Sequence, residues 1–205
     1  MSLVKTSGTA LADKLRQNLR TKYGMGSSSA PDTMCLLLDI SGSMTEAADA
    51  DTAYQGRHRA IVSAPAGQQR IDKLNELILN FQNIRRFSFS HGCSELTPSE
   101  TQVYCDGGGT NMAAAFLTLK RKGIKHAIMV TDGEPDSEQL AIQAAQGLKI
   151  DCFYVGTDPA PPFLEILSEQ TGGSYGKASL LRIKELTAAV KERLMLVAPA
   201  KGIAL

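Results

Sequence analysis

Apolar residues along the chain alternate between short strand-like runs and longer segments with helical spacing. Met34–Ile40, Ala127–Val130 and Ile150–Val155 are continuous apolar runs bounded by turn residues, and Arg86–Ser90 alternates apolar and polar residues. Runs of this length are typical of strands buried in a parallel sheet. A shorter run, Gln102–Cys105, predicts an edge strand.

Between and after these runs, apolar residues recur every three or four positions, which is the spacing of one helix face. Five such faces are Leu74, Leu77, Ile78 and Phe81; Met112, Ala115, Phe116 and Leu119; Leu140, Ala144 and Leu148; Phe163, Leu164 and Leu167; and Leu186, Val190, Leu194 and Val197. Strands that alternate with helices of this length predict an α/β domain with a mainly parallel sheet and right-handed crossovers.

The N-terminal part of the chain has a different pattern. Leu11, Leu15, Leu19 and Tyr23 recur at helical spacing with basic residues between them, and a serine-rich stretch follows. We therefore divide the chain into a basic amphipathic helix at 1–25, a linker at 26–32, the α/β domain at 33–198 and a tail at 199–205. We expect the helix to pack on the domain or to self-associate.

Residues 45–69 separate the first strand from its helix by far more than the usual connection of about 2–6 residues. They predict an inserted loop. Loops of this length are commonly functional or disordered. Because the insertion follows Ser43 directly, we expect it to shape the choice of partner or to cover the site described below, and to be mobile on its own.

Composition narrows the class of protein. The chain has 205 residues, of which 43% are hydrophobic, and a formal net charge of +1. This fits one domain with short extensions and gives no indication of a nucleic-acid surface. No apolar run approaches the roughly 18–20 residues that span a bilayer, and the N-terminus lacks the apolar stretch of a signal peptide. Cys35, Cys93, Cys105 and Cys152 form no CxxC pair, so we expect reduced thiols and a cytoplasmic location.

Oxygen-bearing side chains stand at three boundaries between predicted elements. Asp39, Ser41 and Ser43 follow the first strand, Thr110 opens a helix after three glycines, and Asp132 follows another strand. Because the carboxyl ends of parallel strands meet at one sheet edge, we expect these five side chains to converge. Hydroxyl and carboxylate oxygens suit a hard cation, best Mg²⁺, then Mn²⁺, and less well Ca²⁺, which normally recruits more ligands.

These segments, DISGS at 39–43, GGGTN at 107–111 and TDG at 131–133, resemble the metal-ion-dependent adhesion site of the von Willebrand factor type A (vWA) domain. Ile150–Gly156 and Gln170–Tyr175 resemble the fifth strand and a late turn of that family. The resemblance extends from about Met34 to Val197 and leaves the N-terminal helix and linker outside it.

The resemblance implies a three-layer, Rossmann-like fold with a mainly parallel six-stranded sheet and one antiparallel edge strand, which Gln102–Cys105 would form. It also implies that hydroxyls bind the metal directly, and that the two carboxylates bind directly or through water. The direct ligands would be Ser41, Ser43 and Thr110, and the carboxylates would be those of Asp39 and Asp132.

The family also implies a function that is not enzymatic. A partner supplies an Asp or Glu side chain to an open position on the metal, and intracellular relatives act as adaptors in assemblies, some with AAA+ ATPases. Neutral hydroxyl ligands offset little of the metal charge, so an anionic oxygen from another molecule is strongly stabilised.

Two alternatives stay open. One is a Mg²⁺-dependent phosphoester hydrolase with Asp39 as nucleophile, which ranks lower because no Lys, His or further strand-end carboxylate completes a catalytic set. The other is a structural module whose site stays empty. Glu134 and Asp136 follow Asp132 closely and are expected to be solvated rim charges or residues at a helix N-terminus.

Overall fold

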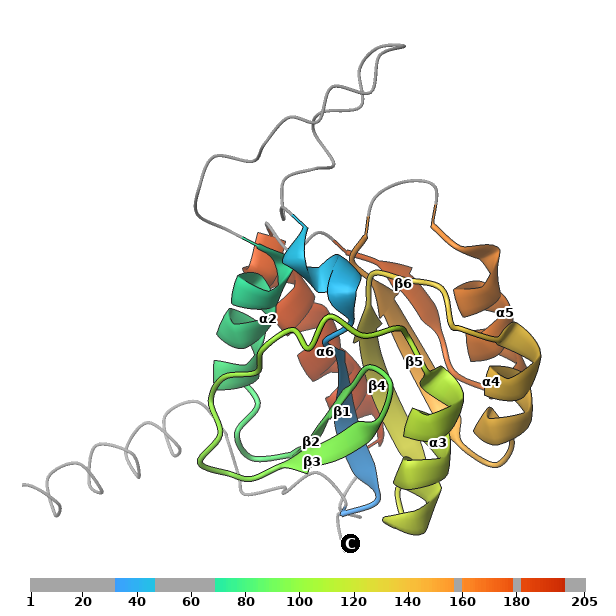
Figure 1. The fold of residues 1–205 in the computed structure, drawn as a ribbon. Coiled ribbons are helices and arrows are strands. Elements are labelled where there is room, and N and C mark those ends of the chain that lie inside the picture. Colours follow the sequence, from blue (N-terminus) through green and yellow to red (C-terminus); the bar gives the residue numbers. More distant parts are fainter. Residues whose placement is uncertain (1–31, 47–68, 157–159, 179–181, 198–205) are drawn as a thin grey trace, which may run out of the picture.

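A sheet with the strand order β3-β2-β1-β4-β5-β6 lies at the centre of the molecule (Figure 1). The structure, a computed structural model, describes residues 32–46, 69–156, 160–178 and 182–197. In these ranges the strands are β1 (Met34–Asp39), β2 (Arg85–Phe89), β3 (Cys93–Leu96), β4 (His126–Thr131), β5 (Lys149–Tyr154) and β6 (Tyr175–Lys177). Neighbouring strands pair in parallel except β2 and β3, which are antiparallel. The prediction of a mainly parallel six-stranded sheet with one antiparallel edge strand is confirmed.

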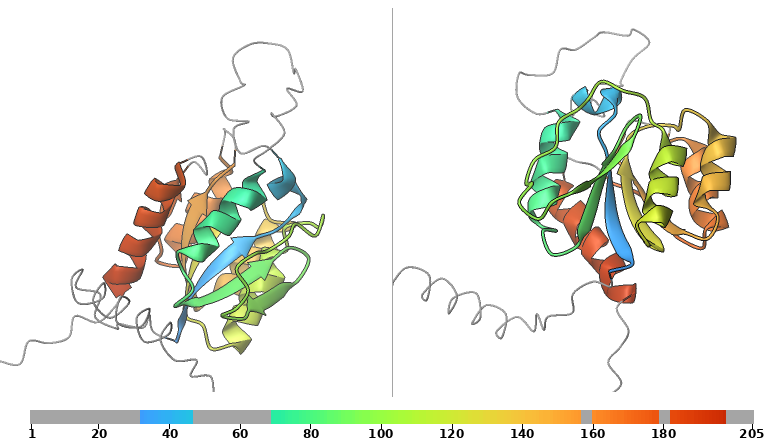
Figure 2. Two further views of the ribbon diagram at one scale, coloured as in Figure 1. Left: turned by 90° about the vertical axis from the view of Figure 1, so that its left-hand side faces the viewer. Right: turned by 60° about the horizontal axis from the view of Figure 1, so that its bottom comes forward.

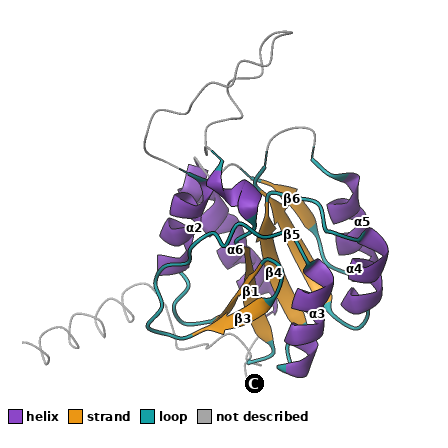
Figure 3. Cartoon of the chain, viewed as in Figure 1, coloured by secondary structure: helices purple, strands orange, loops and turns teal. Residues whose placement is uncertain are grey.

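Helices cover both faces of this sheet, so the three-layer prediction is also confirmed (Figure 3). The helical elements are η1 (Gly42–Thr45), α2 (Arg70–Leu79), α3 (Met112–Arg121), α4 (Glu138–Ala145), α5 (Pro162–Gln170) and α6 (Ile183–Val197). Helices α2 and α6 lie on one face, and α3, α4 and α5 lie on the other. Figure 2 shows the same layering from two further directions.

The apolar run of β1 is continuous because both of its faces are covered. Leu36 and Leu38 pack into the core beneath α2 and α6, whereas Cys35 and Leu37 pack into the core beneath α3, α4 and α5. Successive side chains of a strand point to opposite faces, so a strand between two helical layers needs apolar residues at every position. This burial makes β1 a rigid support for the loop that follows it.

The predicted edge strand at Gln102–Cys105 is wrong, because the antiparallel edge is β3. The chain reverses directly after β2, where the Ser90 N–H donates to the Gly92 carbonyl (2.9 Å), so the next residues pair back along β2. Val103 instead bonds to a side chain: its N–H donates to Asn75 Oδ1 (2.8 Å), and Asn75 Nδ2 donates to its carbonyl (3.0 Å). An amide side chain on α2 thus satisfies the backbone groups that a neighbouring strand would have used.

Two smaller differences also follow from packing. The helical spacing predicts Leu140 on the inner face of a helix, but Leu140 is exposed, and the buried face of α4 is made of Ala141, Ala144 and Ala145. These small side chains allow α4 to pack close to its neighbours. Strand β6 has only three residues, which is too short for its pattern to be recognised in the sequence.

The predicted N-terminal helix, the linker, the tail and most of the insertion lie outside the described residues. The two ends of the insertion are described, and they meet: the Arg70 N–H donates to the Glu46 carbonyl (2.9 Å). The insertion therefore leaves and rejoins the domain at one place, beside η1. None of the helices in the described ranges has the length and apolar character needed to cross a membrane.

Candidate metal centre

The Asp39 carboxylate, at the end of β1, is fully buried and held through both oxygens. The Ser41 N–H donates to Oδ1 (2.8 Å), and the Thr131 hydroxyl, from the end of β4, donates to Oδ2 (2.5 Å). Because β1 and β4 are adjacent parallel strands, their carboxyl ends lie side by side. This arrangement fixes the orientation of the carboxylate without using any charged partner.

A row of hydrogen bonds then joins the serines to Asp132. The Ser41 and Ser43 hydroxyl oxygens lie 3.2 Å apart, and the Ser43 hydroxyl donates to Asp132 Oδ1 (2.7 Å). The backbone turns into η1 at Gly42, and this tight turn brings Ser43 back over the strand end. Residues 89 positions apart in the sequence are thereby in direct contact.

Thr110 reaches the same place from the glycine-rich loop before α3. The Gly42 N–H donates to the Gly108 carbonyl (2.9 Å), which ties that loop to the loop after β1. A methyl group built on Gly133 would lie 3.4 Å from the Thr110 hydroxyl oxygen and 3.8 Å from that of Ser43. The two hydroxyls therefore face a common space next to Gly133, and the five predicted residues are brought together at the carboxyl end of the sheet.

The glycine-rich loop has its shape for two identifiable reasons. Gly107 has a φ of +71°, a conformation that other residues rarely adopt. A Cβ on Gly108 would lie 2.6 Å from the His91 ring, and a Cβ on Gly109 would lie 2.7 Å from the Asp136 carboxylate. The glycines thus allow a close approach of the loop to its neighbours, which places Thr110.

A bound cation would stabilise the buried negative charge of Asp39. Burial raises the pKa of Asp39 from 3.8 to about 6; hydrogen bonds from Thr131 and Ser41 oppose the rise, and the nearby negative charge of Asp132 adds to it. The described residues hold no group of three or more His, Cys, Asp and Glu side chains arranged for a metal, so a metal site in this part of the chain would need other oxygen donors, such as these hydroxyls. Three hydroxyls and two carboxylates form a donor set that fits Mg²⁺ or Mn²⁺.

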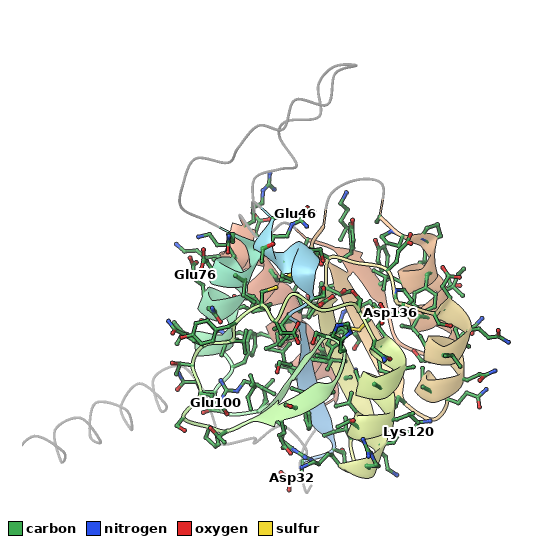
Figure 4. The ribbon with its side chains drawn as sticks, in the orientation of Figure 1. Asp32, Glu46, Glu76, Glu100, Lys120 and Asp136 are labelled. Carbon is green, nitrogen blue, oxygen red and sulfur yellow. The ribbon has the colours of Figure 1, made fainter. Side chains whose placement is uncertain are left out.

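One charged group at the centre is not marked by any pattern in the sequence. Arg70, the first residue of α2, is buried, and its Nη1 lies 2.7 Å from Asp132 Oδ2 and 3.0 Å from Glu46 Oε2. Figure 4 shows Glu46 beside η1 at the upper end of the sheet, and Asp32 at the opposite end. No motif marks Arg70, because it stands after the insertion and comes near Asp132 only in the fold.

Asp136 also has a role that the sequence did not indicate. Its Oδ1 accepts the Thr110 N–H (2.9 Å), and its own N–H donates to the Thr110 carbonyl (3.1 Å). Asp136 is exposed and directly precedes Ser137, the N-cap of α4, as expected, and its carboxylate also ties the loop after β4 to the loop before α3. Asn111 then caps α3, with its side chain accepting the Ala114 N–H (3.0 Å).

Comparison with known proteins identifies the fold. No family model and no curated protein matches the sequence. Among solved structures, the minor pilin PilB from Streptococcus sanguinis is 13% identical, with a TM-score of 0.56, over 81% of this chain and 63% of the pilin chain. A protein described as von Willebrand factor type A from Catenulispora acidiphila is 18% identical, with a TM-score of 0.53, over 79% of this chain and 42% of that one.

The TRAP protein of Plasmodium vivax, in a manganese-loaded crystal structure, is also similar. It is 18% identical, with a TM-score of 0.51, over 80% of this chain and 74% of the TRAP chain. The chain thus spans less than two thirds of the first two proteins, and identities this low are informative about the fold alone. With its sheet order and helical layers, the described part of the chain has the fold of a von Willebrand factor type A domain.

Proposed function

We propose that the domain is a divalent-metal-dependent protein-interaction module. In this proposal Ser41, Ser43 and Thr110 bind the metal directly, and Asp39 and Asp132 bind it directly or through water. The observation that supports it best is the convergence of hydroxyls and carboxylates from three separate segments at one sheet edge. Mg²⁺ is the preferred ion, Mn²⁺ is an alternative, and Ca²⁺ ranks lower.

The metal would supply a positive centre with an open position for an oxygen ligand. The chain's own residues hold that centre in place: Thr131 and the Ser41 backbone orient Asp39, while Asp136 anchors the loop of Thr110. An anionic oxygen then gains the most from the open position, and the commonest source in a protein is Asp or Glu. We infer that a partner inserts one acidic side chain at this site.

The vWA resemblance extends the proposal to the setting of the protein. We propose an adaptor in an intracellular, cytoplasmic assembly, with an AAA+ ATPase as one candidate partner and no nucleic-acid ligand. The near-neutral charge of the chain supports the last point, because nucleic-acid binders concentrate positive charge.

The environment of Asp39 argues against the alternative of a phosphoester hydrolase. A nucleophilic carboxylate needs an oxygen that can reach the substrate, but both oxygens of Asp39 accept hydrogen bonds and the residue is 0% exposed. We therefore propose a non-enzymatic role. Turnover of a generic phosphoester that requires Mg²⁺ and is lost in Asp39→Asn would contradict this.

Calorimetric titration with Mg²⁺ and Mn²⁺ tests the metal centre. We expect one site in the wild type and a loss of at least about tenfold in affinity in Ser43→Ala and Thr110→Ala, since each change removes a ligand. Ser94→Ala on β3 and Thr118→Ala on α3 are matched controls, because their hydroxyls lie away from the centre. Equal metal affinity in all five proteins would refute the assignment.

Partner binding is tested by a pull-down with the full chain, with and without EDTA. Capture by wild type in Mg²⁺ should disappear in EDTA and in Thr110→Ala, and should persist in Thr118→Ala. Replacing the partner's key carboxylate by its amide should cost several kcal/mol, as is typical when one member of a desolvated charge pair is removed. Metal-independent capture would mean that the centre does not carry recognition.

A further inference from the structure

Arg70 places a positive charge inside the candidate metal centre. Its side chain is 4% exposed, and it pairs with Asp132, whose side chain is 0% exposed, at 2.7 Å. Its second partner, Glu46, is 58% exposed at 3.0 Å, so water screens that ion pair. The strong electrostatic interaction of this guanidinium is therefore with the carboxylate proposed to serve the metal.

The pairing divides the Asp132 carboxylate between two neighbours. Oδ1 accepts the Ser43 hydroxyl (2.7 Å), and Oδ2 accepts Arg70 Nη1 (2.7 Å). Arg70 Nη2 is buried and has no hydrogen-bond partner among the described residues. A buried donor without a partner is costly, so the position of this guanidinium follows from its attraction to Asp132 rather than from a full set of hydrogen bonds.

We propose that Arg70 is a resident cation of the centre, which neutralises Asp132 in the metal-free domain and lowers the affinity for divalent metal. The inference rests on the proposed function, because it concerns the same centre. A guanidinium and a metal ion that share one carboxylate repel each other, and this repulsion is strong where water is excluded. Binding of the metal therefore has to weaken or displace the Arg70–Asp132 contact.

The same charge has a second consequence for the loaded site. Asp39 and Asp132 bring two negative charges, and Arg70 brings one positive charge. A divalent ion then leaves this buried group with one net positive charge, whereas the group would be neutral without Arg70. Arg70 thus makes metal binding weaker and makes the loaded centre more attractive to an acidic partner.

The position of Arg70 connects this effect to the insertion. Its backbone N–H donates to the Glu46 carbonyl and its side chain pairs with the Glu46 carboxylate, so both contacts close the base of the 45–69 loop. A change at this base would move the guanidinium that balances Asp132. The ends of the insertion and the metal are therefore expected to influence each other.

The test is calorimetric titration of full-length Arg70→Gln with Mg²⁺, together with the Tm of the metal-free protein. We expect the variant to bind Mg²⁺ at least about tenfold more tightly than wild type does, because the repulsion between the Arg70 guanidinium and the metal is removed. The metal-free Tm should fall, because Asp132 loses its counter-ion. Arg85→Gln is the matched control, because Arg85 also pairs with a carboxylate, Glu95 (2.7 Å), but at the opposite end of the sheet. The Arg85→Gln variant should bind Mg²⁺ with the affinity of wild type.

If Arg70 only positions Asp132, Arg70→Gln should not increase the affinity for Mg²⁺. If the guanidinium only holds Asp132 in place for the metal, Arg70→Gln will bind Mg²⁺ equally or more weakly, and that result overturns the inference while the proposed function stands. If neither wild type nor variant binds Mg²⁺ or Mn²⁺, the proposed function fails, and the inference fails with it.

A second measurement needs no variant. In wild type, the side-chain Nε resonance of Arg70 should shift during an Mg²⁺ titration with the midpoint found by calorimetry, because the metal weakens or breaks the Arg70–Asp132 contact. The Arg85 resonance should not move. An Arg70 resonance that is unchanged at saturating Mg²⁺ would overturn the inference.

Discussion

Replacing Asp39 by asparagine should have opposite effects on the stability of the metal-free domain and on metal binding. The carboxylate is fully buried, no cationic side chain in the described ranges contacts it, and its pKa is raised to about 6. A rise of about two pKa units corresponds to roughly 3 kcal/mol of destabilisation once the carboxylate is ionised at pH 7. Asparagine has the same shape and removes this cost.

The variant can keep both hydrogen bonds of the carboxylate. The amide oxygen accepts the Ser41 N–H, and the amide nitrogen donates to the Thr131 hydroxyl. The hydrogen bonds of the neutral amide are weaker than those of the carboxylate. We therefore expect the free energy of unfolding of the metal-free domain to rise by about 1–3 kcal/mol. At roughly 2–4 °C per kcal/mol for a chain of this size, the Tm should rise by several degrees.

The effect of pH on the metal-free protein has a defined sign. The folded pKa of Asp39 lies above its unfolded value, so its contribution to stability falls as pH rises from about 4 to about 6, and stays constant above that. The advantage of Asp39→Asn should therefore disappear near pH 4. Denaturant unfolding in EDTA between pH 4 and pH 8 measures this difference.

Asp151→Asn is the matched control, because Asp151 is buried to a similar degree but perturbed in the opposite direction. Burial acts to raise its pKa, but hydrogen bonds from His126 and Ser174 outweigh that effect and lower it to about 2. Its contribution to stability is full above about pH 4 and is lost as pH falls towards 2. Asp151→Asn should lower the Tm at pH 7.

Added Mg²⁺ completes the test. Mg²⁺ at a hundredfold excess over its Kd should stabilise wild type by about 2.7 kcal/mol, whereas Asp39→Asn should gain much less. A metal-free Tm that falls in Asp39→Asn as it does in Asp151→Asn would refute the argument that the buried charge of Asp39 is unfavourable without metal.

Three further substitutions separate the metal centre from the fold. Gly133→Ala should leave the Tm nearly unchanged but weaken Mg²⁺ binding, since its methyl would lie 3.4 Å from the Thr110 hydroxyl in the space that the ligands face; calorimetry showing wild-type affinity would contradict this. Asp136→Ala should cost about 1–2 kcal/mol in thermal unfolding and also weaken Mg²⁺ binding, because the Thr110 loop loses its anchor. Asn75→Ala should cost about 1–3 kcal/mol through the two unpaired backbone groups of Val103, and an unchanged denaturation midpoint would show that water replaces the amide.

The sequence by itself determined the layered architecture. The continuous apolar run of β1 required helices on both faces of the sheet, and the helical faces between the strands supplied them. It also placed Asp39, Thr110 and Asp132 at element boundaries, where a parallel sheet gathers its strand ends. These features depend on local patterns, which can be read along the chain.

The tertiary structure decided what depends on contacts between distant segments. The antiparallel edge strand is β3 because the chain reverses directly after β2, while Asn75 on α2 satisfies the backbone of Val103 in the predicted segment. Arg70 and Asp136 became part of the centre through contacts with Asp132 and Thr110, 62 and 26 positions away. No local pattern along the chain indicates such pairs, because these side chains come into contact only when the sheet brings separate loops to one edge.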